Sequence, residues 1–369
     1  MSNLMNLFTL RYDPTVRGVE RKAPRDFIPI YSDPEGKKVE EMLRDIIHLK
    51  LRPHKNICVS LSSGVDSTLL LALIRDIFPT KRITALTMSG IKTEEKIAAK
   101  VASQFDADHV KLNFPDIVKE IPLMVKVAGE ARWNVYPYYT RLISKKYGSI
   151  IVNGDGADEI FGGYVFRYRQ FNSLINQGFT KVQSYLRAQK NDWVDDQNKF
   201  FKHRFSWKAI ERLINPYFKN YLETTNQIML ADYNGKFLYD YSRTNASIDR
   251  YFNIESFYPF CDPALTKYAL HLPVHEKVSK NLGKLHLRNI SKRIGLKQHT
   301  KKLGFVLDTR KMYLKNKDEI KKILLNPKNK IYNTINYKWI LNHIDTEDPR
   351  EINKMFQALA LFELKNTKV

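Results

Sequence analysis

Two short segments of the sequence combine residue types that can bind a nucleotide and a metal ion. The first runs from Ser62 to Ser67 (SSGVDS) and contains small hydroxyl side chains, one glycine and one carboxylate. Backbone N–H groups in such a turn, together with the N-terminus of a following helix, can bind an anion such as pyrophosphate. The alternative is that Ser and Asp only cap that helix. This segment by itself leaves both interpretations open.

The second segment runs from Asn153 to Tyr164 (NGDGADEIFGGY) and places three carboxylates among glycines. Gathering Asp155, Asp158 and Glu159 opposes folding, because like charges repel and glycine loses much backbone entropy. A bound cation would explain the cluster, and a set of oxygen ligands suits Mg²⁺. The alternative is a solvated acidic turn, but this cluster interrupts a chain whose net charge is +22. We therefore expect a metal ion near this segment.

Both segments follow short apolar runs that have the composition of buried strands. Residues 56–61 precede the first segment, and residues 149–154 lead into the second. Further strands are expected at 82–88 and 109–114, and helices at 68–78, 93–105, 115–131 and 136–148. Strands that alternate with helices predict an α/β fold, a doubly wound parallel sheet with helices on both faces. Ligands bind near the carboxyl ends of such strands, which is where both segments lie.

The rest of the chain divides into regions of different character. Residues 1–40 carry several prolines and basic side chains with weak periodicity, and we expect an irregular lead-in there. Residues 41–170 contain the predicted α/β core. Residues 171–369 have aromatic and lysine-rich stretches with helical spacing, such as 205–214 and 355–365, and are expected to form a mainly helical part that completes the site.

Composition limits the class of protein. The chain has 369 residues, of which 43% are hydrophobic and 27% charged, as in ordinary folded proteins. Cys58 and Cys261 lie far apart and outside any CxxC spacing, which fits a reducing compartment, and we expect a cytoplasmic protein without a membrane segment. The charge of +22 suggests a polyanionic partner, either nucleic acid, an anionic membrane surface or a phosphorylated ligand, and does not choose among them.

Over roughly residues 40–310 the sequence resembles the synthetase domain of the asparagine synthetase family. In this family the synthetase domain is a PP-loop ATP pyrophosphatase. The first segment is similar to the family's Ser-Gly-Gly-x-Asp-Ser motif, and residues 154–164 match its Gly-(Glu/Asp)-Gly-(Ser/Ala)-Asp-Glu-x-Phe-Gly-Gly-Tyr motif throughout. Downstream matches are Asp249-Arg250, Glu255 with Pro259-Phe260-Cys261-Asp262, Lys284 with Leu287-Arg288, and Lys302 with Gly304-Phe305.

The resemblance implies roles for the matched positions. ATP would contact Leu61, Ser62, Ser63, Gly64, Val65, Asp66, Ser67, Met88, Asn153 and Gly154; Mg²⁺ would be held by Asp66 and Asp158; and the catalytic residues would be Lys284, Asp155 and Glu255. Lys284 would be the cation that stabilises charge on the α-phosphate and on a later oxyanion. Asp155 would orient or deprotonate an incoming amine, or would only lie near the metal.

The family reaction is ATP-dependent amide formation. A substrate carboxylate attacks the α-phosphate, which releases pyrophosphate, and an amine then displaces AMP from the acyl-adenylate. Aspartate, giving asparagine, is the default substrate. Glutamine-dependent members begin with a catalytic cysteine at position 2 and a glutaminase domain, whereas this chain has Ser2 and only residues 1–40 before the synthetase part. We therefore expect nitrogen from free ammonia, from a separate glutaminase subunit, or from an amine within the substrate, as in relatives that close lactam rings.

The sequence departs from the family pattern at three places. Ser63 replaces a glycine, Phe257 stands where the family has the arginine of Glu-x-Arg-x-Pro-Phe, and residues 130–137 lack an Asp-Ser element. The change at Ser63 should be tolerated, because it keeps a short side chain. The other two differences weaken the case for aspartate more than the case for adenylation. Two other functions remain as alternatives: an RNA-modifying enzyme of the same fold, which the positive charge would suit, and a non-catalytic binding protein.

Overall fold

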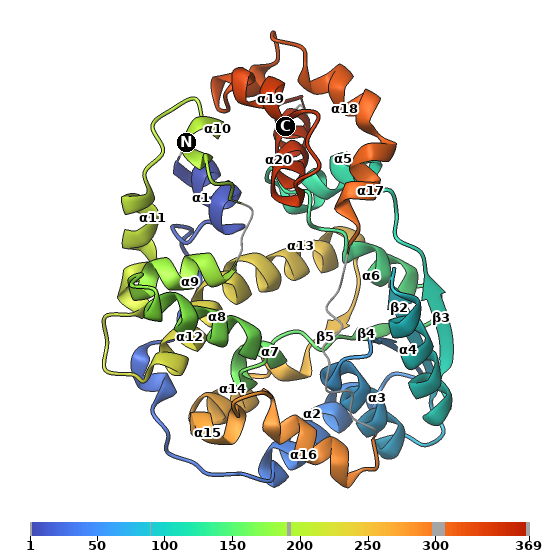
Figure 1. Ribbon diagram of the computed structural model, residues 1–369. Helices are drawn as coiled ribbons and strands as arrows, with labels where there is room; N and C mark the ends of the chain where they lie inside the picture. The colour runs from blue at the N-terminus through green and yellow to red at the C-terminus, as the bar shows by residue number, and fades with distance from the viewer. Residues whose placement is uncertain (1, 89, 190–192, 297–306, 367–369) are drawn as a thin grey trace.

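A five-stranded parallel sheet forms the centre of the computed structural model, which describes residues 2–88, 90–189, 193–296 and 307–366 (Figure 1). The strands lie in the order β3-β2-β1-β4-β5. Their bounds are Asn56–Ser60 for β1, Arg82–Met88 for β2, Asp108–Leu112 for β3, Ile150–Val152 for β4 and Ser256–Phe257 for β5. The predicted doubly wound α/β fold is confirmed. The fifth strand was not predicted, because two residues carry no periodicity.

The inner strands β1, β2 and β4 are buried along most of their length because helices cover both faces of the sheet. In β1, Ile57 and Val59 point into one core and Cys58 into a second, and all three are fully buried. The first core is shared with α2 (Lys37–Leu51), α3 (Val65–Ile77) and α4 (Lys92–Gln104). The second is covered by side chains of α6 (Tyr138–Ser144). This burial explains why the sequences of the inner strands are nearly continuous apolar runs.

The direction of strand order reverses between β1 and β4. From β1 the chain proceeds outward to β2 and β3, and it then returns to place β4 on the other side of β1. A reversal of this kind opens a crevice at the carboxyl ends of the two strands, which is the usual ligand position in open α/β sheets. The two chemistry-bearing segments begin at these ends.

Helices make up most of the remaining chain. They are α5 (Ile117–Ala128), α7 (Ala157–Phe161), α8 (Val165–Asn176), α9 (Lys181–Gln189), α10 (Gln197–Phe200), α11 (Trp207–Ile214), α12 (Thr224–Asp232), α13 (Arg243–Phe252), α14 (Pro263–Leu270), α15 (Val274–Lys277), α16 (Leu285–Arg293), α17 (Thr309–Lys315), α18 (Lys317–Leu324), α19 (Tyr337–His343) and α20 (Pro349–Asn366). A π-helical segment, Tyr233–Ser242, joins α12 to α13. None of the described helices is long and apolar enough to cross a membrane.

The N-terminal region differs from the irregular lead-in expected for residues 1–40. It contains α1 (Ser2–Leu10) and a 3-10 turn, Pro24–Phe27, before α2 begins. The Phe8 ring is fully buried against Phe200 and Phe201, with centroids 6.3 and 6.5 Å away. The buried Lys354 ammonium of α20 donates to the Phe8 carbonyl oxygen at 2.5 Å. Tertiary packing therefore stabilises a helix that is too short to be stable by itself.

Replacing Phe8 with alanine should test this packing. Phe8→Ala should lower the free energy of unfolding by about 3 kcal/mol or more, because it leaves a cavity between α1 and α10. Leu49→Ala in α2 is the control, since Leu49 is 80% exposed and its removal should have little effect. Denaturant unfolding measures both. Equal stabilities for the two variants would contradict the docked position of α1.

Candidate functional site

A cavity of about 390 Å³ opens at the carboxyl ends of β1, β2 and β4. Among the residues that line it are most of those predicted from the sequence to bind ATP, metal or amine: Leu61, Ser62, Gly64, Asp66, Ser67, Met88, Asn153, Gly154, Asp155 and Asp158. The two loops touch, since a Cβ added at Gly154 would lie 3.1 Å from the Asp66 Cβ. The structure therefore brings the two segments into one site.

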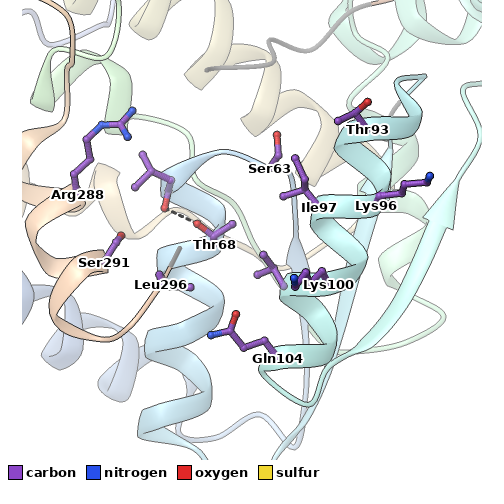
Figure 2. Close-up of a pocket in the computed structure, with 12 residues that line it drawn as sticks. Ser63, Thr68, Thr93, Lys96, Ile97, Lys100, Gln104, Arg288, Ser291 and Leu296 are labelled. Carbon is purple, nitrogen blue, oxygen red and sulfur yellow. Dashed lines mark hydrogen bonds between the residues drawn. The ribbon is translucent and has the colours of Figure 1, made fainter. Parts of the chain in front are cut away.

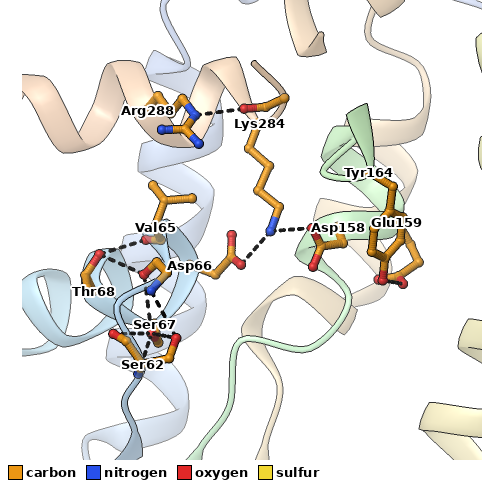
Figure 3. Close-up of polar contacts among 12 residues, drawn as sticks. Ser62, Val65, Asp66, Ser67, Thr68, Asp158, Glu159, Tyr164, Lys284 and Arg288 are labelled. Atoms are coloured by element: carbon orange, nitrogen blue, oxygen red, sulfur yellow. Dashed lines mark hydrogen bonds and ion pairs between the residues drawn. The ribbon is translucent and has the colours of Figure 1, made fainter. Parts of the chain in front are cut away.

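The loop after β1 is held in shape by its own hydroxyls. The Ser62 amide donates to the Ser67 Oγ at 3.0 Å, and the Gly64 amide donates to the Ser62 Oγ at 3.1 Å (Figure 3). The N-cap of α3 is Gly64, and it makes no side-chain capping bond. The helix-capping interpretation of the serines and Asp66 is therefore not what the structure shows. An uncapped helix N-terminus facing a cavity retains its capacity to bind an anion.

The three carboxylates of the second segment point in different directions. The Asp155 side chain is 43% exposed and faces the cavity. Asp158 turns toward α16, while Glu159 is buried and accepts a hydrogen bond from the Tyr164 hydroxyl at 2.6 Å. Burial, together with the charge of Asp158, raises the pKa of Glu159 to about 7. The three carboxylates therefore lie in three different environments and do not form a single acidic patch.

The Lys284 ammonium joins the two loops. Its Nζ lies 2.6 Å from Asp66 Oδ2 and 2.7 Å from Asp158 Oδ1, and its side chain is only 5% exposed (Figure 3). Burial alone would lower the pKa of Lys284, but the two carboxylates outweigh it and raise that pKa above its usual value. The ammonium therefore stays charged at the point where β1, β4 and α16 meet.

Glycines allow Lys284 to reach this position. The Lys284 amide donates to the Phe161 carbonyl at 3.0 Å, and a Cβ at Gly283 would lie 2.1 Å from the Gly162 carbonyl oxygen. A Cβ at Gly163 would clash with the Asp158 carboxylate. Gly283 is therefore required by close backbone approach, and Gly163 leaves the room that the Asp158 carboxylate occupies.

The residues present fit a magnesium ion that is shared with a bound phosphate. The Asp66 and Asp158 carboxylates both lie beside the Lys284 ammonium. Within the described residues, no histidine, cysteine or further acidic side chain joins these two carboxylates to make a three-residue metal-binding group. Mg²⁺ commonly binds through one or two carboxylates plus substrate phosphates. Two carboxylates suit this kind of binding, in which the protein supplies only part of the coordination of the Mg²⁺ ion.

Arg141 and Asn245 are cavity residues that the sequence analysis missed. The Asn245 amide accepts a hydrogen bond from Arg141 at 2.5 Å and donates one to Asp155 at 2.8 Å. Arg141 also lies 3.6 Å from Asp249, whose carboxylate accepts from the Tyr258 hydroxyl. The only available signal was that Arg141 is the one charged residue in the otherwise uncharged helix α6.

A second cavity, of about 350 Å³, lies on the other side of the first loop. Ser63 and Val65, two residues predicted to bind ATP, line this cavity instead of the first. Figure 2 shows Lys96 and Lys100 of α4 on one wall and Arg288 of α16 on the opposite wall. No carboxylate is among the described residues that line it. The loop therefore separates the two cavities, with different residues facing each.

The predicted catalytic role of Glu255 needs correction. Its carboxylate pairs with the Lys50 ammonium at 2.8 Å, lies 3.7 Å from His54 and is 45% exposed. Glu255 immediately precedes β5 and therefore sits at the amino end of the sheet, whereas the cavity lies at the carboxyl ends. The geometry gives it no contact with the site. The predicted match at Lys302, Gly304 and Phe305 falls outside the described residues.

Comparisons with known proteins identify the family. The family model described as "Asparagine synthase" matches residues 38–364, so the chain belongs to the asparagine synthase family. It is 23% identical over 191 residues to asparagine synthetase [glutamine-hydrolyzing] 1 of Bacillus subtilis, covering 49% of this chain and 29% of that protein. It is 25% identical over 174 residues to the putative asparagine synthetase [glutamine-hydrolyzing] 2 of Methanocaldococcus jannaschii, covering 44% of this chain and 33% of that protein. The match spans about a third of these relatives' length.

Solved structures show only a distant likeness. An NH3-dependent NAD synthetase from Campylobacter jejuni aligns at 14% identity with a TM-score of 0.29, covering 54% of this chain and 95% of that one. An NMN synthetase from Francisella tularensis aligns at 10% identity with a TM-score of 0.26, covering 75% of this chain and 100% of that one.

Removing the Lys284 ammonium should expose the repulsion between the two carboxylates. Lys284→Met should lower the free energy of unfolding by about 3 kcal/mol, because the half-buried carboxylates of Asp66 and Asp158 lose the cation that they share. Added Mg²⁺ should raise the thermal unfolding midpoint of this variant more than that of the parent protein. Lys280→Met, an exposed position nearby, is the control. A variant whose midpoint does not respond to Mg²⁺ would argue against a metal position at Asp66 and Asp158.

The buried Lys277 should make the stability of the protein depend on pH. This residue lies where α15 packs on α16. Burial lowers its pKa to about 7 from 10.5, so the unfolded chain binds more protons than the folded one between these values. The free energy of unfolding should therefore rise with pH between these two values. Below about pH 7, where Lys277 is charged in both states, its contribution should no longer change with pH. From about pH 7 to about pH 9, the rise in the parent protein should exceed that in Lys277→Met by about 2 kcal/mol.

Denaturant titrations at the two pH values measure the effect, with Lys280→Met as the exposed control. Parallel pH profiles for the parent protein and Lys277→Met would show that Lys277 keeps its charge when folded.

Proposed function

We propose that this chain is an ATP-dependent synthetase that activates a substrate carboxylate as an acyl-adenylate and then forms an amide, with release of pyrophosphate and AMP. The observation that carries the proposal is that the Lys284 ammonium pairs with both Asp66 and Asp158, two carboxylates that line the cavity at the switch point of the sheet. Family membership supports the same reaction class.

The first half of the reaction uses the loop after β1. Ser62, Gly64 and Ser67 and the N-terminus of α3 would hold the phosphates of ATP, and Leu61 and Met88 would contact the nucleoside. A carboxylate oxygen of the substrate attacks the α-phosphorus, and the bond from that phosphorus to pyrophosphate breaks. Lys284 would oppose the negative charge that builds on the α-phosphate. Mg²⁺ held by Asp66 and Asp158 would supply further positive charge to the phosphates.

The second half forms the amide. The amine nitrogen attacks the acyl carbon, the bond to AMP breaks, and the nitrogen loses a proton. Asp155 is the carboxylate with the exposure needed to orient the amine or accept that proton. Aspartate is the default acid, with ammonia supplied free or by a separate glutaminase. A substrate that carries its own amine, and would therefore close a lactam, fits the same cavity chemistry.

Cellular placement is part of the proposal. Cys58 and Cys261 are both free thiols, which fits a reducing cytoplasm. ATP is also most available there as a co-substrate.

Pyrophosphate release tests the proposal. The chain should release pyrophosphate when supplied with ATP, Mg²⁺, ammonia and an acid from a panel of small carboxylic acids, and the product mass should show an amide. Asp158→Ala should reduce the rate by about a hundredfold or more, because the metal and Lys284 lose a partner. Asp106→Ala is the control, since that side chain is 97% exposed.

Three outcomes would oppose the proposal. A fully active Asp158→Ala would remove the proposed metal site from the chemistry. Failure to release pyrophosphate with every acid would overturn the synthetase assignment. Release that depends on added RNA and not on an acid would favour the RNA-modifying alternative.

A further inference from the structure

Two segments far apart in the sequence carry positive charge and no carboxylate. Residues 197–206 contain three lysines or arginines, and residues 326–344 contain three more, while neither segment contains aspartate or glutamate. The whole chain has 39 acidic residues, so both segments are depleted of negative charge. Their six cations are Lys199, Lys202, Arg204, Lys328, Lys330 and Lys338.

The fold places the two segments side by side. Phe201 forms an isolated antiparallel bridge with Ile335, and the Lys202 amide donates to the Thr334 carbonyl at 3.0 Å. Helix α10 of the first segment packs on α19 of the second, at the same end of the molecule (Figure 1). The six cations therefore lie on one region of the molecule, which we call the basic surface.

The protein does not neutralise the basic surface itself. All six residues are exposed, and within the part of the chain that the structure describes none of their side chains makes an ion pair or a hydrogen bond. The carboxylates just before α10 are already used, since Asp195 pairs with Arg350 at 3.4 Å and Asp196 accepts from the Trp339 indole at 3.0 Å. Cations left together in this way repel one another, and a polyanion would relieve that repulsion.

The apolar side chains of the two segments point inward, which argues against a membrane as the polyanion. Phe200, Ile331, Ile335 and Trp339 are each at most 3% exposed. Among the described residues of both segments, only Leu341 exposes a large apolar side chain. A protein that binds a membrane surface usually inserts several apolar side chains next to its cations. The basic surface offers almost nothing to insert.

Exposed asparagines lie among the cations instead. Asn198, Asn326 and Asn333 are all exposed. An amide side chain both donates and accepts hydrogen bonds, and asparagine, lysine and arginine all commonly contact the phosphates and sugars of nucleic acids. The residue types of the basic surface therefore match a phosphodiester backbone better than a lipid surface.

We propose that the basic surface binds nucleic acid by contacting its phosphates. This inference goes beyond the proposed function and does not depend on it, because the basic surface lies at the opposite end of the molecule from α16, which begins beside Lys284 (Figure 1). Phosphates present the same charge in every sequence, so binding should show little base preference.

Fluorescence anisotropy with two labelled probes tests the proposal. The probes are a single-stranded RNA of mixed sequence and a DNA duplex of the same sequence. At least one should bind the full chain with a Kd below about 100 μM in about 0.1 M salt. The logarithm of its binding constant should fall linearly with the logarithm of the salt concentration, with a slope of about −3 or steeper, because each neutralised phosphate contributes about 0.7 to 0.9.

A triple variant locates the binding on the basic surface. Lys202→Gln, Arg204→Gln and Lys330→Gln together should weaken binding about a hundredfold in about 0.1 M salt and reduce the magnitude of the slope by about 2. If this triple variant does not fold, Lys202→Gln alone should still weaken binding about fivefold.

A second triple variant is the matched control. Lys55→Gln, Lys119→Gln and Lys280→Gln together remove the same charge from exposed positions elsewhere, and should bind within about threefold of the parent protein. Equal thermal unfolding midpoints for the parent and both triple variants show that all three are folded.

Three results would overturn the inference. The first is that neither probe binds. The second is that both triple variants lose the same affinity, because binding would then depend on net charge and not on this surface. The third is that vesicles containing phosphatidylserine bind the protein while neither nucleic acid does. None of these results bears on pyrophosphate release, which is measured without nucleic acid, so the two proposals fail separately.

Discussion

A buried ammonium between two carboxylates organises this protein's site. Lys284 contacts Asp66 from the loop after β1 and Asp158 from the loop after β4, and these three residues belong to segments far apart in the chain. None of the three charges would be stable alone in a buried position. The cation therefore fixes the distance between the two loops, and the cavity exists because that distance is maintained.

The backbone contributes as much to this geometry as the charges do. Gly283 and Gly162 approach so closely that neither the turn before α16 nor the end of α7 could hold its position with a side chain at residue 283. Lys284 itself adopts a left-handed conformation, with φ of 58°, which is uncommon for a residue with a Cβ. Strain of this kind persists where surrounding contacts outweigh it, and here these include the two ion pairs.

The cavity separates its two kinds of polar chemistry. One end has the hydroxyls of the loop after β1 and a helix N-terminus, which suit phosphate, and the two carboxylates that hold Lys284. The other end has Arg141, Asn245 and Asp155, and the Asn245 amide bridges the two opposite charges, which lie 3.8 Å apart. The proposed reaction, which joins a phosphorylated co-substrate, an acid and an amine, would use both ends. The net charge of +22 explains little of this, since Arg141 is the only lysine or arginine among the described residues that line the cavity.

Local patterns were enough to predict the α/β core, four of its strands and the meeting of the two motif loops, because strand composition and parallel order are short-range consequences of sequence. Residue contacts between distant segments were not predictable from pattern alone. Glu255 matched a motif, yet the direction of β5 places it at the amino end of the sheet, beside Lys50. Arg141 matched none, yet α6 carries it into the cavity. The residue types and the loops were thus determined by the sequence itself. Which charges face each other was decided by the tertiary structure, because electrostatic pairing depends on distance in space and not along the chain.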